Sequence, residues 1–459
     1  MPSRLPAALA RATIPEPVLE VLRTLDAAGH RSWLVGGAVR DVLLGRRRDG
    51  LDFDLATPAT PDEVTRLFPR VIPTGIEHGT VTVLVGKEKV EVTTFRGEGA
   101  YVDGRRPESV TFHRDLEADL ARRDFTINAL AFDPVGADFR DPFGGRADLR
   151  ARTIRAVGDP DARFGEDGLR PMRAVRFAAQ LGFSVHPRTR SAIPRALDVV
   201  RRVSAERIAD ELAKLLVAPH AEEGLHLLRR TGLLEAVIPA VAALAPRALD
   251  HVVRVAPRAP ARLEARLAAL LHRTRPDDAR AIALDLRFAR RVADEVSALV
   301  AAHACVLDGA APAPEEPAHV RRWLARVGPA RADAVLALRD AEVLAAPPSR
   351  RERLRAAAGA LRARVATVTA QRPPLATGDL AMDGAAVMRF LDLPPGPAVG
   401  EALRHLLDRV LEDPALNDRG ALSVELSRWW EARVLSLKAG NAGNEADRGG
   451  GKTEGSRGR

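Results

Sequence analysis

A strand, a two-glycine turn and a short helix are expected in close succession near the N-terminus. Residues 33–35 are apolar, Gly36 and Gly37 follow directly, and residues 38–44 have a helical pattern. Glycines allow the backbone to approach a ligand closely, and the first turn of a helix has free N–H groups that favour an anion. This order of elements predicts an anion-binding turn at the end of a strand.

A pair of aspartates follows the turn at a spacing typical of one face of a strand. Asp52 and Asp54 are two residues apart, and alternate residues of a strand point to the same side. Two carboxylates beside a phosphate-sized turn offer the oxygen ligands that one or two Mg²⁺ ions prefer, and such ions can hold a nucleotide triphosphate. Each pattern alone is common, but the two in this order predict a nucleotide site.

The other N-terminal segments predict further strands and a long loop. Residues 62–68 have a helical pattern, and two apolar runs at 81–85 and 89–95 predict a hairpin. Residues 97–119 are rich in glycine and charge and favour neither helix nor strand. Long loops inside compact domains are usually functional or disordered.

Two arginines and an aspartate stand at the predicted start of a helix over residues 122–130. Arg122 and Arg123 could hold a triphosphate, and Asp124 could accept a hydrogen bond from a ribose hydroxyl. Charged residues near a helix terminus also stabilise the helix without any ligand. Taken alone, the stretch fits both interpretations.

Asp167 and Arg170 are three residues apart where the chain becomes helical, so we expect them to share a helix face. As a surface ion pair they would contribute little. Cytosine and adenine each present an exocyclic amine donor beside a ring-nitrogen acceptor, which a carboxylate and a guanidinium match, whereas uracil and guanine present the reverse pattern. The pair could therefore select CTP and ATP without a nucleic-acid template.

The chain is basic throughout and helical in pattern after residue 166. Its 459 residues carry a formal net charge of +9, which suits a polyanionic partner, although alanine and arginine are abundant everywhere. Residues 204–216 predict an amphipathic helix capped by Ser204, and another helical module spans 375–437. Residues 438–459 are almost without apolar side chains, and we expect a disordered tail.

Cysteine use and hydropathy bear on the compartment. The single cysteine, Cys305, excludes an internal disulfide framework and a cysteine-based zinc site, and it fits a reducing compartment. No apolar run is long enough to span a membrane, and the longest, at 233–245, includes Glu235 and Pro239. The N-terminus has no signal-peptide pattern, so we expect a cytoplasmic protein.

The glycine turn and the aspartate pair together resemble the nucleotidyltransferase core shared by DNA polymerase beta, poly(A) polymerases and tRNA CCA-adding enzymes. With the remaining motifs, the chain resembles the bacterial CCA tRNA nucleotidyltransferases that are related to bacterial poly(A) polymerases. The resemblance is strong over residues 31–245 and weaker over 284–300 and 375–419. Its motifs stand in the family's order: 36–41, Asp52-x-Asp54, 122–130, 141–145, Glu166-Asp167-x-x-Arg170, and Glu206-Arg207 with Glu211-Leu212.

This resemblance implies a role for each matching residue. Asp52 and Asp54 would bind two Mg²⁺ ions, with Glu91 as a candidate third carboxylate, although an outward polar position on a half-buried strand explains Glu91 equally well. The residues implied to bind the nucleotide are Gly36, Gly37, Arg40, Arg123, Asp124, Asn128, Glu166, Asp167 and Arg170. The loop at 97–119 resembles the flexible loop of CCA-adding enzymes, and its candidate residues are Tyr101, Asp103, Arg105 and Arg106.

The implied fold is α+β, with a small mixed-sheet nucleotidyltransferase head followed by an all-α neck, body and tail. We expect the parts in this order: a head at 1–157, a nucleotide-selecting and RNA-binding neck at 158–245, a helical body at 246–370, a tRNA-binding module at 371–437 and the disordered tail at 438–459.

Many bacterial relatives also carry a metal-dependent phosphohydrolase domain marked by a His-Asp pair. No histidine of this chain is followed by aspartate. His251 and the pair His272-Arg273 stand where the ligands of that domain are expected, but arginine stays protonated and binds no metal. We therefore predict a degenerate scaffold without phosphatase activity.

The implied reaction is in-line transfer of CMP and AMP from CTP and ATP to the 3′-hydroxyl of a tRNA, with release of pyrophosphate. Poly(A) polymerases use the same core, and some bacteria divide the task between a CC-adding and an A-adding enzyme. The loop at 97–119 favours an enzyme that adds both. A dead core that only binds RNA is a further alternative, and the intact Asp52, Asp54, Arg123 and Arg170 argue against it. The sequence leaves the oligomeric state open.

Overall fold

The chain forms two compact units, Met1–Ser297 and Ala298–Arg459. The structure is a computed structural model that describes residues 5–46, 53–76, 79–98, 110–112, 114–307 and 316–449. Across these ranges, no helix combines the length and the apolar composition needed to span a membrane.

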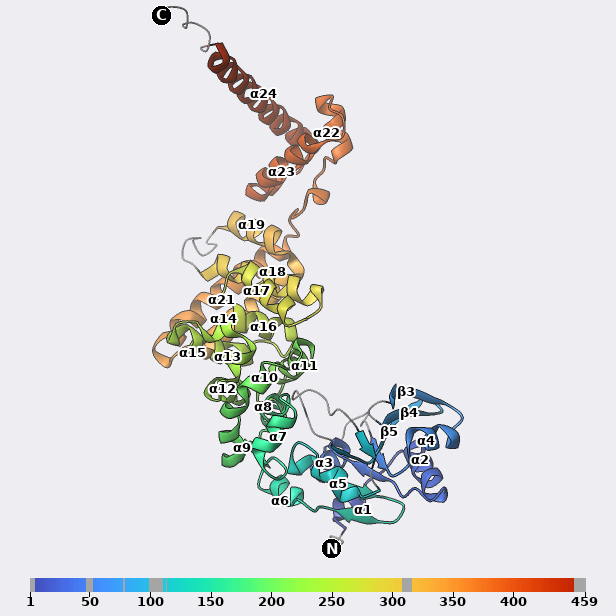
Figure 1. The fold of residues 1–459 in the computed structure, drawn as a ribbon. Helices are drawn as coiled ribbons and strands as arrows, with labels where there is room; N and C mark the ends of the chain where they lie inside the picture. Colours follow the sequence, from blue (N-terminus) through green and yellow to red (C-terminus); the bar gives the residue numbers. More distant parts are fainter. Residues whose placement is uncertain are drawn as a thin grey trace, which may run out of the picture. The chain divides into compact units, whose positions relative to one another are not determined.

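A mixed seven-stranded sheet lies in the first unit, as predicted for the head (Figure 1). Its strand order is β3-β4-β5-β2-β1-β8-β9, and all neighbours are antiparallel except β2 and β5. The strands are β1 (Trp33–Val35), β2 (Asp54–Thr57), β3 (Val71–Gly75), β4 (Thr80–Val85), β5 (Glu88–Thr94), β8 (Ala131–Asp133) and β9 (Asp138–Arg140). The hairpin of β4 and β5 confirms the one predicted over residues 81–95.

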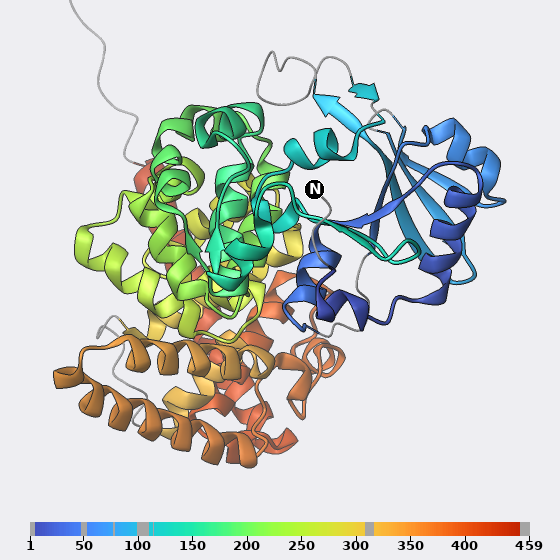
Figure 2. The same ribbon diagram turned by 90° about the horizontal axis from the view of Figure 1, so that it is seen from below.

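The two faces of this sheet have different chemistry. Helices α2 (Glu16–Ala27) and α4 (Pro61–Leu67) lie beside β4 and β5 (Figures 1 and 2). The aliphatic side chains that share one face across four strands are at most 2% exposed: Leu34, Leu55, Val81 and Val92. Because side chains alternate along a strand, Asp54 and Glu91 lie on the other face.

Shorter elements complete the sheet region and include a predicted turn. They are α1 (Ala7–Ala10), α3 (Gly37–Leu43), β6 (Arg96–Glu98), β7 (Val110–Phe112), α5 (Leu116–Ala121), the 3₁₀-helix η2 (Thr126–Asn128), α6 (Gly145–Arg150) and β10 (Thr153–Ile154). The turn predicted at 141–145 is present. The Asp141 carboxylate closes it by accepting hydrogen bonds from the N–H groups of Gly145 (2.6 Å) and Arg146 (3.0 Å).

Helices dominate the chain beyond residue 159. In order, the elements are α7 (Pro160–Glu166), α8 (Arg170–Leu181), β11 (Ser184–Val185), α9 (Pro187–Ala192), η3 (Pro194–Ala196), α10 (Leu197–Val200), α11 (Ala205–Leu216), α12 (Ala221–Arg230), α13 (Leu233–Val237), α14 (Pro239–Ala242), α15 (Pro246–Val255), η4 (Ala256–Arg258), α16 (Leu263–Leu271), α17 (Pro276–Asp285) and α18 (Arg290–Leu307). α8 packs against α11 and α12. A Cβ atom placed on Gly224 of α12 would lie 2.8 Å from the side chain of Ala179, so this glycine allows the close approach of the two helices.

Six further helices form most of the second unit. They are α19 (Pro317–Val327), α20 (Pro329–Ala345), α21 (Pro348–Ala370), α22 (Gly384–Leu391), α23 (Pro397–Glu412) and α24 (Arg419–Gly449), with the 3₁₀-helices η5 (Thr377–Asp379) and η6 (Pro414–Leu416). Leu406 of α23 packs with Leu422 and Leu426 of α24 in one apolar core. The buried Arg321 donates from Nε to the carbonyl oxygen of Leu411 (2.8 Å) and so caps the end of α23.

Helix α24 extends further than the composition predicts. It continues to Gly449, so residues 438–449 are helical where we expected a disordered tail. The three alanines with Lys438, Glu445 and Arg448 favour a helix by intrinsic propensity, whereas the three glycines and two asparagines of the same stretch disfavour it, so the composition alone does not indicate this extension. The domain boundaries predicted at residues 157, 245, 370 and 437 stay predictions.

Candidate active site

The predicted glycine turn is present, and two other predicted residues meet at it. Gly36 follows β1 with φ 70° and ψ −129°, a conformation that side chains disfavour, and α3 begins at Gly37. A Cβ atom placed on Gly36 would lie 3.0 Å from Nη1 of Arg123 and 3.9 Å from Oδ2 of Asp54. The bare backbone of Gly36 therefore lets a guanidinium and a carboxylate come close to the turn.

Asp54 begins β2 and is half-buried. It lies opposite Val35 of β1 and, across the parallel pair, opposite Glu91 of β5. Paired positions of adjacent strands share a face of the sheet, and Glu91 is exposed on that face. The register thus brings the candidate third carboxylate next to Asp54, and both offer the oxygen ligands that hard divalent cations prefer.

The other predicted metal ligand, Asp52, lies outside the described residues. The same holds for the four candidate residues of the loop, which are Tyr101, Asp103, Arg105 and Arg106. Their roles stay predictions.

Residues 122–130 do not begin a helix, which corrects our prediction. Arg122 is the C-terminal cap of α5, the backbone is extended at Phe125, and the short η2 follows. Arg122 and Arg123 lie three and four residues after Asp119, and both form ion pairs with its carboxylate. This spacing places the arginines directly after the C-terminus of one helix instead of in the first turn of another, and cations stabilise a helix C-terminus.

Asp124 is buried, and its carboxylate accepts three hydrogen bonds from the protein. Oδ1 accepts from the N–H of Phe125 (2.8 Å) and from Nδ2 of Asn128 (3.0 Å), and Oδ2 accepts from Nε of Arg173 (2.7 Å). Burial alone would raise the pKa of this carboxyl, but Arg173 and these hydrogen bonds outweigh burial and lower the pKa below its ordinary value. Asp124 is therefore ionised at neutral pH and fixed in orientation.

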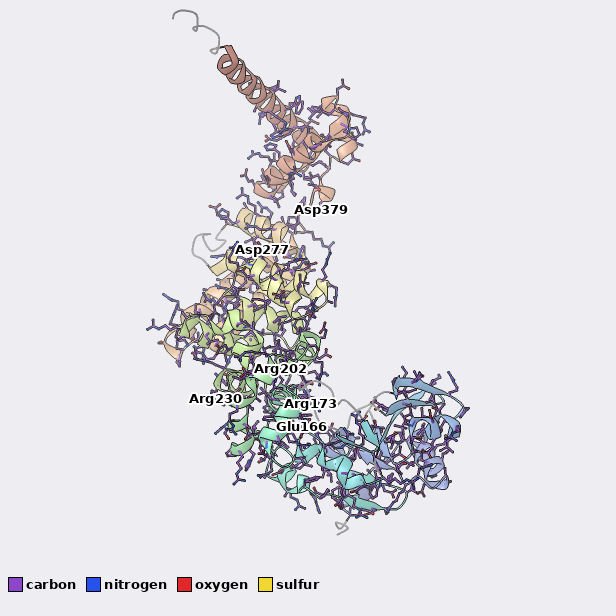
Figure 3. All side chains as sticks on the ribbon, viewed as in Figure 1. Glu166, Arg173, Arg202, Arg230, Asp277 and Asp379 are labelled. Carbon is purple, nitrogen blue, oxygen red and sulfur yellow. The ribbon has the colours of Figure 1, made fainter. Side chains whose placement is uncertain are left out.

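Asn128 and Arg173, the side chains that hold Asp124, each contact a further charged side chain. Oδ1 of Asn128 accepts a hydrogen bond from Nη1 of Arg40 (2.7 Å), whose side chain is buried beside the glycine turn. Arg173 of α8, labelled in Figure 3, lies 3.7 Å from the Glu211 carboxylate of α11, and Arg176 donates a hydrogen bond to the same carboxylate. A continuous set of polar side chains therefore connects α3, η2, α8 and α11.

Sequence reasoning did not single out Arg173 and Arg176. A signal was present, because Arg170, Arg173 and Arg176 recur every third residue in a segment whose other side chains are mostly apolar. Charged residues on an otherwise apolar helix need partners when they are buried, and here Glu211 and Asp124 supply them.

Our prediction that Asp167 and Arg170 share a helix face is wrong. α7 ends at Glu166, Asp167 has φ −139° and ψ 107°, and α8 begins at Arg170. Pro171 explains the break, because proline is favoured in the first turn of a helix and disfavoured inside one. The two residues are still close in the chain, on either side of a turn.

Arg170 is 7% exposed, and its guanidinium donates to protein acceptors. Nη1 donates to the Glu166 carboxylate and to the carbonyl oxygen of Arg163 (2.8 Å), and Nη2 donates to the carbonyl oxygen of Arg122 (2.8 Å). Glu166, also shown in Figure 3, thus supports Arg170 as an ion-pair partner. These contacts connect the turn before α8 to the end of α5.

Asp167 is more accessible than Arg170 and is held from both sides. Oδ1 accepts the N–H of Leu169 (3.0 Å), and Oδ2 accepts from Nη2 of Arg207 (2.9 Å) in α11. Its side chain is 26% exposed. The carboxylate therefore has a fixed position and still reaches the surface.

His251 and His272, the candidates for a degenerate phosphohydrolase site, contact each other. Their ring centroids are 5.2 Å apart in an edge-to-face arrangement, and Nδ1 of His272 lies 2.7 Å from the carbonyl oxygen of Ala269. The absence of phosphatase activity stays a prediction.

Two family models and several known proteins match this chain. The family model of the poly A polymerase head domain matches residues 32–155, and the model of the probable RNA and SrmB-binding site of polymerase A matches residues 182–244. The CCA-adding enzyme of Geobacillus thermodenitrificans (strain NG80-2) is 39% identical over 404 residues, which cover 88% of this chain and 94% of the relative. That of Geobacillus kaustophilus (strain HTA426) is 41% identical over the same shares.

Solved structures of CCA-adding enzymes also match this chain. The crystal structure of the Bacillus stearothermophilus CCA-adding enzyme in complex with CTP matches 92% of this chain and 100% of its own, with a TM-score of 0.74 and 35% identity. The Thermotoga maritima CCA-adding enzyme complexed with tRNA has the same fold at 19% identity, with a TM-score of 0.64 over 92% of this chain and 98% of its own. This chain belongs to the family of CCA-adding enzymes.

Proposed function

We propose that this protein adds CMP and AMP, taken from CTP and ATP, to the 3′ end of tRNA and releases pyrophosphate, without a nucleic-acid template. The observation that carries the proposal is the match to CCA-adding enzymes over nearly their whole length. The geometry supports it, because Gly36, Asp54 and Arg123 converge at one turn. A turn with a carboxylate and a guanidinium suits a metal-bound triphosphate.

Family membership implies the use of a divalent metal, and we propose two Mg²⁺ ions held by Asp52 and Asp54. The oxygen chemistry fits, since Asp54 lies beside Glu91 on one face of the sheet. Bound Mg²⁺ would make the attacking 3′-hydroxyl more acidic and neutralise charge on the pyrophosphate. The protein's part is to hold the reacting groups in line, and we assign Glu91 as a third carboxylate near the metals.

Phosphate binding is assigned to the glycine turn and Arg123. Nη1 of Arg123 lies beside Gly36, at the turn where we place the triphosphate. A guanidinium held at such a turn is suited to phosphate oxygens. Arg40, Asp124 and Asn128 are assigned to the same nucleotide site, where they hold one another through hydrogen bonds.

Base selection is assigned to Asp167 and Arg170, with Glu166 in support. Asp167 would accept a hydrogen bond from the exocyclic amine of cytosine or adenine, and Arg170 would donate to the adjacent ring nitrogen. Arg207 orients the Asp167 carboxylate for this purpose through its hydrogen bond to Oδ2. Uracil and guanine would place a carbonyl oxygen opposite the Asp167 carboxylate and a ring N–H opposite the Arg170 guanidinium, so the site would reject them.

The tRNA is assigned to the helices of residues 182–244, the segment that matches the RNA-binding family model. The net charge of +9 favours contacts with phosphates, and phosphate contacts weaken as salt rises. The affinity for tRNA should therefore fall steeply between low and moderate salt, and an affinity independent of salt would contradict this assignment.

The function is tested by offering single labelled nucleotides, with Mg²⁺, to three tRNA transcripts that end before the CCA, after one C and after both Cs. We expect CMP on the first two transcripts and one AMP on the third. Use of CTP alone would identify a CC-adding enzyme, and use of ATP alone on the third transcript an A-adding enzyme. Long A tracts would identify a poly(A) polymerase, and no Mg²⁺-dependent incorporation would leave an RNA-binding protein on an inactive core.

A further inference from the structure

Asp119 lies at the end of α5 and is completely buried, yet the function proposed above gives it no role. Its two carboxylate oxygens are divided between two arginines. Oδ1 accepts from Nε (2.9 Å) and Nη2 (2.6 Å) of Arg122, and Oδ2 accepts from Nη2 of Arg123 (3.2 Å). A buried carboxylate with both oxygens occupied has a fixed orientation.

We propose that Asp119 is a positioning residue that holds the guanidinium of Arg123 against the glycine turn. The proposal rests on the proposed function, because it assumes that Arg123 binds the triphosphate. Nη1 of Arg123 lies 3.0 Å from where a Cβ of Gly36 would be. Among the described residues, Asp119 supplies the hydrogen bond and the ion pair that fix this guanidinium.

Asp119 is itself held in place, so its carboxylate would not move together with Arg123. Arg122 holds the other oxygen of Asp119, and the carbonyl oxygen of Arg122 accepts from Nη2 of Arg170 (2.8 Å). Arg122 is therefore fixed at both its side chain and its backbone. Asp119 consequently presents one oxygen to Arg123 in a constant direction, and the guanidinium takes its orientation from it.

Asp119 also stays charged in this buried position. Burial alone would raise the pKa of its carboxyl, but the positive charges of Arg123 and Arg122 and their hydrogen bonds lower the pKa below the ordinary value. Substitution by asparagine preserves the size of the side chain, removes its charge and turns an N–H₂ group toward one of the two arginines. The guanidinium of Arg123 would then lose its anchor.

The test is the steady-state incorporation of CMP and AMP by full-length Asp119→Asn. Because all nucleotides share the triphosphate, we expect KM for CTP and for ATP to rise by the same factor, about tenfold, with a smaller change in kcat. Asp133→Asn is the matched control. Asp133 is 4% exposed and accepts from Arg31, but it lies on β8, and among the described residues its hydrogen-bond partners are Arg31, Val135 and Gly136, which lie outside the proposed site.

A second measurement separates positioning from general stability. In an Arg123→Met background, Asp119→Asn should raise KM by less than about twofold, because the residue through which it acts is gone. The proposal would be overturned if the KM increases caused by Asp119→Asn and by Arg123→Met multiply in the double variant, or if Asp119→Asn alone has a wild-type KM. If Asp119→Asn does not fold, Asp119→Glu carries the test, since it keeps the charge and displaces it by one methylene: a raised KM supports the proposal and a wild-type KM overturns it. A wild-type protein that incorporates no nucleotide would instead refute the proposed function.

Discussion

Replacing Gly168 with alanine should disable nucleotide selection while leaving most of the protein folded. Gly168 is buried between Asp167 and the start of α8, and it faces the end of α10. A Cβ atom at this position would lie 2.5 Å from the carbonyl oxygen of Val199, 2.7 Å from its carbonyl carbon and 3.0 Å from the nitrogen of Val200. These are backbone atoms, so no side-chain rotation can relieve the overlap.

The size of the effect follows from the displacement that the new methyl group requires. Ordinary contact begins at 3.4 Å, so the turn must retreat from α10 by roughly 0.9 Å. The retreat would move Asp167, whose carboxylate is held by the N–H of Leu169 and by Arg207. A misplacement of about 1 Å lowers a catalysed rate by about 10²-fold, and overpacking of this kind lowers the free energy of unfolding by about 1–3 kcal/mol.

The assay is the kcat/KM for CMP addition to a tRNA transcript that ends before the CCA, together with the ratio of CTP to UTP use. Gly165→Ala is the matched control, because Gly165 lies three residues earlier in α7 and a Cβ there would meet nothing within 4 Å. The control should keep wild-type kinetics and gain up to about 1 kcal/mol of stability from its higher helix propensity. A Gly168→Ala protein with wild-type kcat/KM and wild-type selectivity would refute the reasoning.

Three further outcomes are expected. Asp54→Asn should lower nucleotide incorporation by about 10³-fold while tRNA binding, measured by filter retention, persists, and near-wild-type incorporation would remove Asp54 from the metal site. Arg173→Met leaves the buried Asp124 without its cation and should lower the free energy of unfolding by about 3 kcal/mol in urea titrations; an unchanged value would show that the ion pair adds no stability. The folded-state pKa of Asp124 lies below its ordinary value of 3.8, so the stability that its carboxylate contributes is present above that pH and is lost as the pH falls through the folded-state pKa. Asp124→Asn should therefore flatten the pH dependence of the free energy of unfolding below about pH 4. Parallel pH curves for the wild-type and Asp124→Asn proteins would contradict this.

The glycine turn and the β4–β5 hairpin could be predicted because local sequence determines both. Gly36 has a positive φ that other residues disfavour, so a glycine after a short apolar run is an informative signal. Alternation of side chains likewise fixes which residues of β5 face the core, and Val90 and Val92 are buried while Glu91 is exposed. In such segments the local pattern and the tertiary structure require the same conformation.

Helix boundaries near the site could not be predicted from periodicity alone. Asp167 and Arg170 have helical spacing, but Pro171 begins a new helix and Asp167 takes an extended conformation before it. The same difficulty affected Arg122 and Arg123, which we placed at the start of a helix. Their pairing with Asp119, three and four residues earlier, marks the end of α5 instead.

Ion pairs between residues far apart in the chain could not be predicted for a different reason. The hydrogen bond from Arg173 to Asp124 joins residues 49 apart in the chain, and Arg176 pairs with Glu211, 35 residues away. With 70 basic and 61 acidic residues in the chain, one sequence does not indicate which partners meet. Only the packing of α8 against α11 decides that Glu211 lies between Arg173 and Arg176.

The most direct measurement is the sequence of the 3′ ends formed when the protein, Mg²⁺ and all four nucleotides are incubated with a tRNA transcript that lacks the CCA. A protein template that accepts cytosine and adenine and then stops predicts transcripts that end in a single CCA, with neither UMP nor GMP incorporated. Runs of A, ends that stop at CC, or incorporation of UMP or GMP at a comparable rate would contradict the account.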